Sequence, residues 1–378
     1  MPVGVVQRAK RVVSVQTSSE RGGAEYANVD LLVALAERGW DVTLVTNQPE
    51  LARGTRLPVR TIDLGPKLRR ANWPRVLGAA PLSALRLARA LRELRPTATL
   101  VHFKKEQLLV GAMPARLTGD VVWAEWGPVP FPMRRGPGRW LYVRAARRAR
   151  RVFCVSVGTA DSVIAAGVPS DKVDVLPVLI DVDAIGFDPT SRERLRDQWG
   201  IGPFEFVIGC LTRLQRKKRV GVAIDAMADL DGHARLLIAG EGEEEATLRA
   251  QAAPWGDRIM FVGNVRGQAA AFLSACDVLV FTPSPTEGAP RAISLAQLVG
   301  LPVISTASPG AAELMGEGSG TVLDRPNDPQ ALAEALVAYR DDPERRRREG
   351  EVGRRLAVAR HDRERTLLAL EAAIGLRS

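Results

Sequence analysis

Apolar and polar positions along the first fifty residues form a short repeating pattern. Residues 11 to 19 and 41 to 46 are runs of β-branched and aliphatic residues, which are typical of buried strands. Between them, residues 26 to 39 place apolar side chains at the spacing of an amphipathic helix. A polar, glycine-containing stretch, ERGGAE, joins the first strand to this helix. This order predicts a βαβ unit whose loop lies at the carboxyl edge of a parallel sheet.

The same alternation continues through the first half and then restarts. Further strands of the first half are predicted at residues 99 to 103, 121 to 126, 151 to 156 and 172 to 178. In the second half, predicted strands begin with residues 204 to 213, 234 to 240 and 258 to 263, with helices at 220 to 230 and 243 to 253 between them. Two α/β units of similar length predict two parallel sheets with a cleft between them.

The point at which the pattern restarts predicts the domain boundaries. We expect residues 1 to 187 to form a first domain and residues 188 to 360 a second. The Arg-rich stretch from 341 to 365 is typical of closing helices. We expect the last helix, within residues 361 to 378, to pack back on the first domain.

Composition agrees with a globular, cytoplasmic protein. At 378 residues the chain is too long for one core of ordinary size. Cys154, Cys210 and Cys276 lie far apart in apolar runs, without the spacing of a metal site, so we expect three buried thiols in a reducing compartment. Charged residues interrupt the N-terminal apolar run, and no window of about 18 apolar residues occurs. The sequence therefore predicts neither a signal peptide nor a membrane span.

The excess positive charge lies in the first half. The net charge is +10, with 28 Lys and Arg against 16 Asp and Glu in residues 1 to 187, and 25 against 27 in the remainder. Residues 133 to 151 contain eight Arg and no acid, beside Trp, Leu, Tyr and Val. This segment is either a solvated helix face or a basic amphipathic helix that touches an anionic membrane or substrate. No aromatic and basic interleaving of a nucleic-acid module occurs, so we expect no nucleic-acid partner.

Loops after two predicted strands hold the candidate chemistry of the second half. Arg213 and Lys218 follow the strand that begins at residue 204, where two cations and helix-end amides can bind a phosphate or diphosphate; a merely solvated loop is the alternative. Glu287 precedes a predicted helix and can accept hydrogen bonds from sugar hydroxyls while the first helix amides bind other oxygens of the ligand. The alternative for Glu287 is a helix cap, although Glu is a poor capping residue.

These segments, in this order, resemble the retaining glycosyltransferases of family 4, which have the GT-B fold. The resemblance covers most of the chain and rests on GGAE, LTRLQRKKRVGVAIDAMADL, LLIAGEGEEEATL, IMFVGNV and SPTEGAPRAISLAQLVGLPVISTASPGAAELM. It implies two Rossmann-like domains whose parallel sheets face each other across a cleft. The first would hold the acceptor, and the second a nucleotide-diphosphate sugar.

The resemblance also implies roles for individual residues. Arg213 and Lys218 would bind the diphosphate, and Glu287 would hold donor sugar hydroxyls. The other residues that would line the donor site are Gly22, Gly23, Asn264, Val265, Gly288, Ala289, Pro290, Arg291 and Leu295. No metal or other cofactor is implied, because the Arg and Lys pair neutralises the diphosphate. The acidic DVD sequence at residues 181 to 183 looks like a metal-binding motif but falls in a linker segment.

Three positions depart from the family pattern. Leu295 replaces the second acid of the Glu-x7-Glu motif, which puts recognition of the nucleotide ribose in doubt. Arg219 replaces the glycine after the loop lysine, and Trp126 replaces the histidine of a first-domain His-Gly pair. His102, Glu125 and Trp126 are therefore the acceptor-side candidates. Trp126 either stacks on a sugar or planar acceptor, or packs at a strand end.

The family implies transfer of a sugar to a small-molecule or lipid acceptor with retention of configuration. The leaving diphosphate would accept the acceptor proton while Arg213 and Lys218 stabilise its charge. The alternative is a catalytically weakened GT-B protein that acts as a binding or scaffold partner, which the departures at Leu295 and Trp126 would permit.

Overall fold

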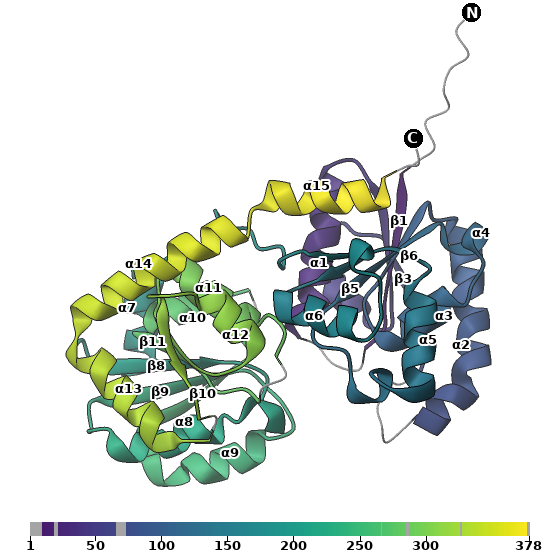
Figure 1. Cartoon of the computed structure of the whole chain (residues 1–378). Helices are drawn as coiled ribbons and strands as arrows, with labels where there is room; N and C mark the ends of the chain where they lie inside the picture. Colours follow the sequence, from purple (N-terminus) through teal and green to yellow (C-terminus); the bar gives the residue numbers. More distant parts are fainter. Residues whose placement is uncertain are drawn as a thin grey trace, which may run out of the picture. The chain divides into compact units, whose positions relative to one another are not determined.

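The computed structural model describes residues 10–18, 22–65, 73–265, 267–284, 287–325 and 327–375. The chain divides into two compact units, which are described separately (Figure 1). The first unit comprises Met1–Ile180 and Arg363–Ser378, and the second comprises Asp181–Asp362. Parts of two predicted loops, residues 19–21 and 285–286, lie outside the described residues.

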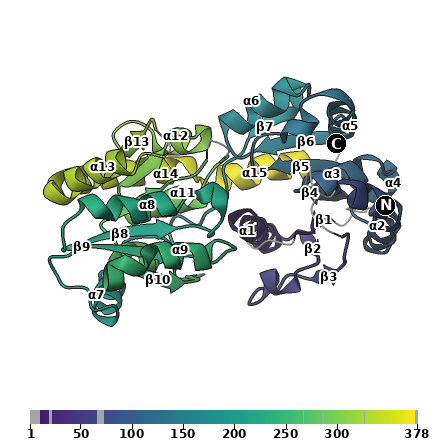
Figure 2. The same ribbon diagram turned by 90° about the horizontal axis from the view of Figure 1, so that it is seen from below.

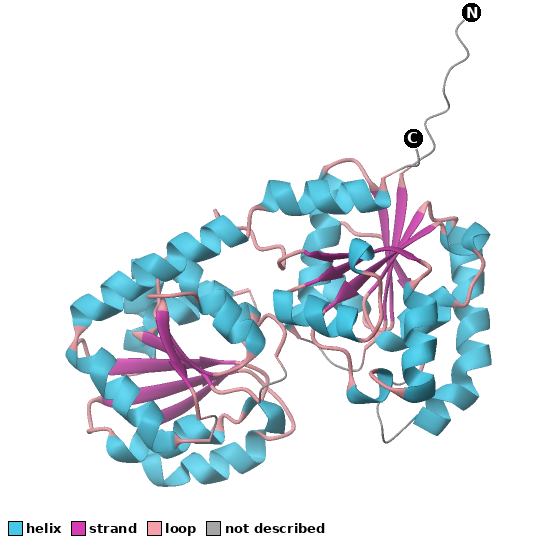
Figure 3. Cartoon of the chain, viewed as in Figure 1, coloured by secondary structure: helices cyan, strands magenta, loops and turns pink. Residues whose placement is uncertain are grey.

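The first unit is built on a parallel sheet (Figure 3). Its seven described strands pair in the order β3-β2-β1-β4-β5-β6-β7. The strands are β1 (Arg11–Gln16), β2 (Asp41–Thr46), β3 (Val59–Thr61), β4 (Ala98–Val101), β5 (Asp120–Glu125), β6 (Ala149–Cys154) and β7 (Val173–Val175). Because parallel strands must be covered on both faces, the order predicts two helical layers.

Helices cover both faces of this sheet. They are α1 (Gly23–Glu37), α2 (Trp73–Leu94), α3 (Lys104–Gly111), α4 (Ala115–Thr118), α5 (Gly136–Ala146), α6 (Val157–Ala165) and α15 (Arg363–Ile374), with the 3-10 turns η1 (Pro49–Ala52), η2 (Phe131–Met133) and η3 (Ser170–Lys172). One buried cluster joins the sheet to α2, α3, α5 and α6. A second cluster joins the opposite face to α1 and α15.

The second unit repeats this architecture with a parallel sheet of six described strands (Figure 2). Their order is β10-β9-β8-β11-β12-β13. The strands are β8 (Phe206–Leu211), β9 (Ala234–Ala239), β10 (Ile259–Gly263), β11 (Val278–Phe281), β12 (Val303–Thr306) and β13 (Gly320–Leu323). Their near-continuous apolar sequences fit strands that are buried on both faces.

The helices of the second unit lie in two layers, which Figure 1 shows on either side of the sheet. One layer contains α8 (Gly221–Ala226), α9 (Glu245–Ala252) and α13 (Pro329–Asp341), which share a buried cluster with the strands. The other contains α7 (Pro189–Gln198), α10 (Ala269–Ala275), α11 (Arg291–Val299), α12 (Pro309–Met315) and α14 (Pro343–Arg360). The 3-10 turns are η4 (Arg216–Lys218), η5 (Met227–Asp229) and η6 (Ala253–Arg258).

In each sheet the strand order reverses at one point. The reversal lies between β1 and β4 in the first unit and between β8 and β11 in the second. Loops that leave neighbouring strands diverge at such a point, and the crevice they leave at the carboxyl edge is where open α/β sheets bind ligands. The loops after β1, β4, β8 and β11 are therefore the places to look for function.

Several predicted strands are shorter in the structure. β1 ends at Gln16, because the backbone N–H of Thr17 donates to the Glu106 carboxylate and not to a neighbouring strand (3.2 Å). β7 ends at Val175, two residues before Pro177, which has no N–H to donate to a sheet. The three cysteines are free and buried, as predicted. None of the described helices is long and apolar enough to span a membrane.

Candidate active site

The loops after β8 and β11 are joined at the switch point of the second unit. The Thr282 hydroxyl donates to the carbonyl oxygens of Lys218 (3.2 Å) and Arg219 (3.0 Å). The backbone N–H of Ser284 donates to the carbonyl of Lys217 (2.7 Å). These bonds fix the basic turn η4 against the stretch that leads to Glu287.

Lys218 and Glu287 form an ion pair at this junction. The Lys218 Nζ lies 2.8 Å from Glu287 Oε2, and the two side chains are only 11% and 15% exposed. Nζ also lies 5.1 Å from the ring centroid of Phe281, the last residue of β11. Arg213 and Lys218 come from the same loop, and Glu287 comes from the other, so the structure brings the predicted cation and carboxylate together.

Burial lowers the pKa of Lys218. Desolvation lowers its pKa below the ordinary value of a lysine, the neighbouring Glu287 opposes this shift, and the positive charges of Lys217 and Arg213 add to it. A cation held among other cations and shielded from water interacts strongly with a dianionic ligand, because the local dielectric constant is low. The arrangement is suited to holding a diphosphate beside a group that accepts hydrogen bonds from hydroxyls.

The loop after β9 supports the stretch that carries Arg213. Gly240 has φ of +133°, and a Cβ at this position would overlap the carbonyl oxygen of Thr212. Only glycine fits this close approach, so the start of the Arg213 loop rests directly on the backbone that follows β9. The N–H of Leu214 then donates to the Glu241 carbonyl (2.9 Å).

Arg219, one of the departures from the family pattern, has a structural attachment. Its backbone is left-handed, with φ of +49°. The guanidinium donates to Asn327 Oδ1 (3.1 Å) and to the carbonyl oxygen of Pro283. Arg219 therefore ties η4 to the loops after β11 and β13.

The residues that follow Glu287 lead into α11, which begins at Arg291. Pro290 precedes the helix at the N-cap position and makes no side-chain capping hydrogen bond. A Cβ on Gly310, near the start of α12, would overlap the carbonyl oxygen of Gly288, which shows how closely the two helix starts approach. Ala289, between them, is half-buried.

Leu295 lies in the middle of α11 and is buried. Its neighbour in sequence, Ser294, lies 2.9 Å from Nε2 of the buried His361, at the end of α14. α11 is thus held by apolar packing and by polar contacts, which include the donation from the Gln297 amide to the Leu314 carbonyl (3.0 Å). The sequence did not identify His361 as a partner of α11.

Asn264 and Val265 lie elsewhere on the carboxyl edge. They follow β10, which is an edge strand in the described sheet and is separated from β11 by β9 and β8. The carbonyl of Val265 accepts a hydrogen bond from the N–H of Gln268 (2.9 Å). The structure therefore does not place this pair directly beside Glu287.

In the first unit, Gly22 and Gly23 stand at the start of α1. Gly22 has an extended backbone with φ of −147°, and its carbonyl accepts from the N–H of Tyr26 (3.2 Å). No side chain caps the helix at this position. The two glycines of the predicted turn thus form the N-cap and the first residue of α1.

His102 lies at the switch point of the first unit, after β4, in a buried polar chain. Its Nε2 lies 2.9 Å from the Ser14 hydroxyl of β1, and the Trp126 indole N–H donates to its Nδ1 (3.2 Å). The rings of His102 and Trp126 are stacked, with centroids 5.9 Å apart. Asn28 of α1 extends the chain by donating to Ser14 (3.0 Å).

Burial keeps His102 neutral. Desolvation lowers the pKa of His102 from 6.5 to about 3. Because Trp126 donates to Nδ1, the proton of the neutral ring is on Nε2 and points at Ser14. The sequence predicted His102 and Trp126 as acceptor-side candidates. It did not indicate that Ser14 and Asn28 belong to the same hydrogen-bond chain.

Glu125 forms an ion pair and a hydrogen bond with neighbouring residues of the first unit. It is buried, forms an ion pair with Lys104, and accepts a hydrogen bond from the Tyr142 hydroxyl (2.9 Å). These contacts join β5 to the start of α3 and to α5. Glu125 precedes Trp126 in the sequence, but its described partners, Lys104 and Tyr142, do not belong to the hydrogen-bond chain of His102.

Glu106 is a buried acid that sequence reasoning missed. One carboxylate oxygen accepts from the N–H and hydroxyl of Thr17, and the other has no hydrogen-bond partner among the described residues. Burial raises the pKa of Glu106, whereas Lys105 and the Thr17 hydrogen bonds oppose that shift. Glu106 fixes the chain where it leaves β1 for the glycine turn.

The acidic linker motif forms a local turn. The carboxylate of Asp181 accepts from the backbone N–H groups of Asp183 (3.2 Å) and Ala184 (3.3 Å). This is an Asx-type turn, which accounts for an Asp at position 181.

Two family models match the chain, one for each half. Residues 21–184 match the model described as Glycosyltransferase Family 4. Residues 191–356 match the model described as Glycosyl transferases group 1. The second match includes Arg213, Lys218 and Glu287.

Curated bacterial relatives are similar over part of their length. A GDP-mannose-dependent alpha-(1-6)-phosphatidylinositol monomannoside mannosyltransferase from Mycolicibacterium smegmatis is 29% identical over 58% of this chain and 62% of its own. A D-inositol 3-phosphate glycosyltransferase from Pseudarthrobacter chlorophenolicus is 31% identical over 58% of this chain and 53% of its own. The chain thus aligns with less than two thirds of each relative.

The fold is similar over nearly the whole chain to a solved structure of HepE from Anabaena in complex with UDP and glucose. The TM-score is 0.82 at 20% identity, over 97% of this chain and 99% of that one. The two-unit architecture is therefore the GT-B fold, as predicted. The two family matches, which together span residues 21–184 and 191–356, make the chain a member of glycosyltransferase family 4.

Proposed function

We propose that this chain transfers a sugar from a nucleotide-diphosphate sugar to a small-molecule or lipid acceptor, with retention of anomeric configuration and without a metal ion. The observation that carries the proposal is the Lys218–Glu287 pair at the switch point of the second unit. A cation and a carboxylate from two adjoining loops, next to an uncapped helix start, form a site for a diphosphate and a sugar. The relatives named above are glycosyltransferases, which supports this assignment.

The mechanism follows from the charges of the site. Without a ligand, Lys218 and Glu287 neutralise each other. A bound donor places its diphosphate near Arg213, Lys218 and the first amides of α11, and its sugar hydroxyls near Glu287. As the bond between sugar and diphosphate breaks, negative charge builds up on the leaving phosphate, and fixed cations stabilise it without reorganisation.

The leaving diphosphate then takes the proton from the acceptor hydroxyl on the face from which it departs. The new glycosidic bond forms on that same face, so the configuration is retained. This step needs positioning and electrostatic stabilisation and no dedicated protein base. It is therefore compatible with a neutral, buried His102 and with Trp126 at the family's histidine position.

The acceptor class follows from less direct observations. The names of two relatives refer to phosphatidylinositol and to inositol 3-phosphate, which share an inositol phosphate group. The first half of this chain has an excess of basic residues, as a phosphorylated acceptor would require. We propose a cytoplasmic enzyme that contacts an anionic membrane through residues 133 to 151.

The first test is nucleotide binding, measured as a thermal shift with UDP, GDP, ADP and TDP and their sugar conjugates, with and without EDTA. A ligand present at about 100 times its Kd adds about 2.7 kcal/mol to the free energy of unfolding. We expect one nucleotide to stabilise the wild type with EDTA present. Arg213→Ala should lose most of this shift, whereas Arg216→Ala, an exposed charge of the same loop, should keep it.

Two outcomes would contradict the proposal. A nucleotide shift that requires a divalent cation would overturn metal independence. No shift with any nucleotide would overturn the donor site and leave a binding or scaffold role in its place.

A further inference from the structure

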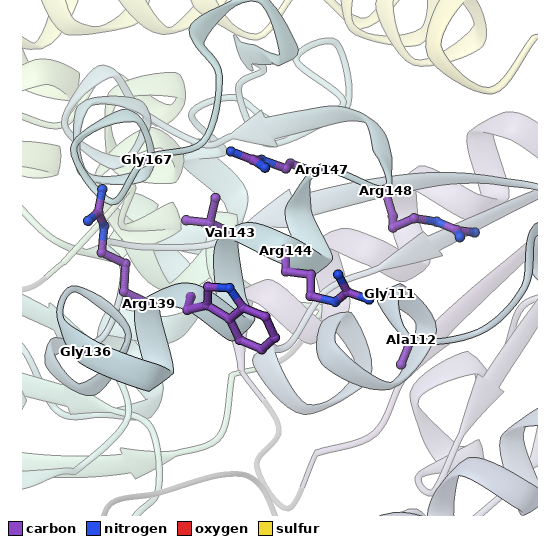
Figure 4. Close-up of a pocket in the computed structure, with 10 residues that line it drawn as sticks. Gly111, Ala112, Gly136, Arg139, Val143, Arg144, Arg147, Arg148 and Gly167 are labelled. Atoms are coloured by element: carbon purple, nitrogen blue, oxygen red, sulfur yellow. The ribbon is translucent and has the colours of Figure 1, made fainter.

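A groove of about 840 Å³ runs along α5 in the first unit (Figure 4). Its other walls are the end of α3 and the turn after α6. The residues that line it are Gly111, Ala112, Gly136, Arg139, Trp140, Val143, Arg144, Arg147, Arg148 and Gly167. We call this feature the arginine groove. Four of its ten lining residues are arginines, and none is acidic.

None of the described carboxylates forms an ion pair with the four arginines. The guanidinium of Arg139 donates to the carbonyl of Ala166 (2.7 Å), and that of Arg148 donates to the carbonyl of Met113 (3.2 Å). Arg144 lies over the ring of Trp140, 5.6 Å from its centroid. Throughout the described part of the chain, no ion pair involves any of the groove arginines, and residues 126 to 160 contain no Asp or Glu. The groove therefore keeps its full positive charge.

Large apolar side chains are exposed beside these charges. Trp140 is 61% exposed, Leu141 46% and Phe131, in the adjoining η2, 69%. The opposite side of α5, including Tyr142 and Ala145, is buried against the sheet. A helix that is anchored on one side and shows arginines with Trp and Leu on the other, beside an exposed Phe of the preceding turn, has the composition of a membrane-interface helix.

The groove is separate from the candidate acceptor residues of the first unit. Arg147 and Arg148 follow the end of α5 and precede β6, so they lie at the amino edge of the sheet. His102 and Trp126 follow β4 and β5, at its carboxyl edge. The groove residues thus have no part in the site proposed for the transfer reaction.

We propose that the arginine groove docks on an anionic phospholipid bilayer. Its guanidinium groups bind headgroup phosphates, and Trp140, Leu141 and Phe131 enter the interfacial layer. This inference rests on the membrane contact proposed for residues 133 to 151 and adds which side chains make the contact and what each of them binds.

A bilayer fits the groove better than a single free phosphate. In Figure 4 the arginine side chains are spread along the groove and do not converge on one point. All four are exposed, as is Trp140. A free anion has no use for the exposed apolar side chains, whereas a lipid surface offers both rows of phosphates and an apolar layer beneath them.

The test is cosedimentation of the full chain with vesicles of phosphatidylcholine alone and with phosphatidylglycerol added. We expect binding only to the anionic vesicles, and loss of binding in about 1 M salt, where screening is nearly complete. Each arginine near an anionic surface contributes about a fivefold factor in affinity, so Arg144→Gln with Arg147→Gln should weaken binding roughly 25-fold. Trp140→Ala should weaken binding to the anionic vesicles at low salt as well.

The matched control is Arg347→Gln with Arg348→Gln, which removes the same charge from exposed positions of α14. The control should bind vesicles like the wild type. Equal weakening in both double variants would show an effect of net charge and overturn the groove as the docking surface. Saturable binding of inorganic phosphate with no vesicle binding would assign the groove to a free anion instead.

Nucleotide thermal shifts separate this inference from the proposed function. The groove variants should keep the wild-type shift, because their residues belong to the first unit, whereas Lys218 and Glu287 belong to the second. Loss of vesicle binding with an intact nucleotide shift supports the groove. Intact vesicle binding in the groove variant overturns it, whatever the nucleotide result.

Discussion

The two units present different chemistry at the same topological position. Each has a parallel sheet whose strand order reverses once, and in each the loops at the reversal are rich in polar side chains. In the second unit these loops hold an ion pair between Lys218 and Glu287. In the first unit they hold a neutral hydrogen-bond chain. There the Ser14 hydroxyl is hydrogen-bonded to Nε2 of His102, and Nδ1 of His102 accepts a hydrogen bond from the Trp126 indole.

This difference shows that the loops, and not the sheets, decide what each unit can bind. The charged loops suit a diphosphate and the hydroxyls of a sugar. The neutral chain presents an aromatic surface and no free charge, which suits recognition by shape and stacking. The same fold thus supports two kinds of recognition within one chain.

The largest expected effect comes from removing the carboxylate of the charged unit. Glu287→Gln should lower kcat by about 100- to 1,000-fold, as for other groups that act on the transition state, while nucleotide binding is largely kept. The measurement is steady-state kinetics with the donor found by thermal shift. Glu241→Gln, an exposed acid after β9, is the control and should leave kcat unchanged. Equal activity of Glu287→Gln and wild type would show that the carboxylate has no role in the reaction, and the contrast between a charged site in the second unit and a neutral one in the first would lose its functional meaning.

The next effect is a pH dependence that arises in the neutral unit. The pKa of His102 falls from 6.5 in the unfolded chain to about 3 in the folded one, so only the unfolded chain takes up the proton as the pH falls below 6.5. His102 should therefore cost about 2 kcal/mol of stability between pH 7 and pH 5. Urea unfolding at both pH values should show this loss in the wild type and a smaller one in His102→Gln. The same loss in both would show that His102 is not held neutral.

The indole hydrogen bond should have a smaller effect. Trp126→Phe keeps the ring but leaves Nδ1 of His102 without a donor, which should cost about 1 kcal/mol in the free energy of unfolding. A double-mutant cycle with His102→Gln measures the coupling directly. If the effects of the two variants are additive, the bond does not contribute to stability.

The smallest effect concerns Arg219 and its left-handed backbone. Glycine adopts φ of +49° without strain, so Arg219→Gly should be more stable than Arg219→Ala by about 1 kcal/mol. Both variants lose the guanidinium hydrogen bonds to Pro283 and Asn327, so the difference in stability between them measures only the cost of the left-handed backbone. Thermal unfolding measures it. An alanine variant at least as stable as the glycine one would contradict the left-handed turn.

Sequence reasoning anticipated the charged unit better than the neutral one. Arg213 and Lys218 follow a predicted strand, Glu287 precedes a predicted helix, and the rule that open α/β sheets bind ligands at their carboxyl edges is enough to bring the three residues to one edge of the sheet. The pairing of Lys218 with Glu287 needed the strand order, because it depends on β8 and β11 being neighbours. The fold class needed only the alternation of apolar strands and amphipathic helices.

The buried network of the first unit could not be read from the sequence. Ser14 lies inside an apolar strand, and His102 is 88 residues away, so no local pattern joins them. Glu125 looked available because the sequence does not reveal that Lys104 and Tyr142 already satisfy it. Such contacts depend on how deeply a side chain is buried and on how the helices pack against the sheet. The spacing of apolar residues in the sequence specifies neither.

The last described helix has a consequence for how the protein is made. α15 buries Leu367 and Leu370 in the core of the first unit, and Glu371 accepts from the indole of Trp40 (2.8 Å). The N-terminal unit therefore receives part of its core only after the whole second unit has been synthesised. A ribosome that stalls in α14 would release a chain whose second unit has most of its residues and whose first unit lacks the part of its core that α15 supplies. In such a fragment the incompletely folded unit would be the N-terminal one, although it was translated first, and quality control would act on that unit.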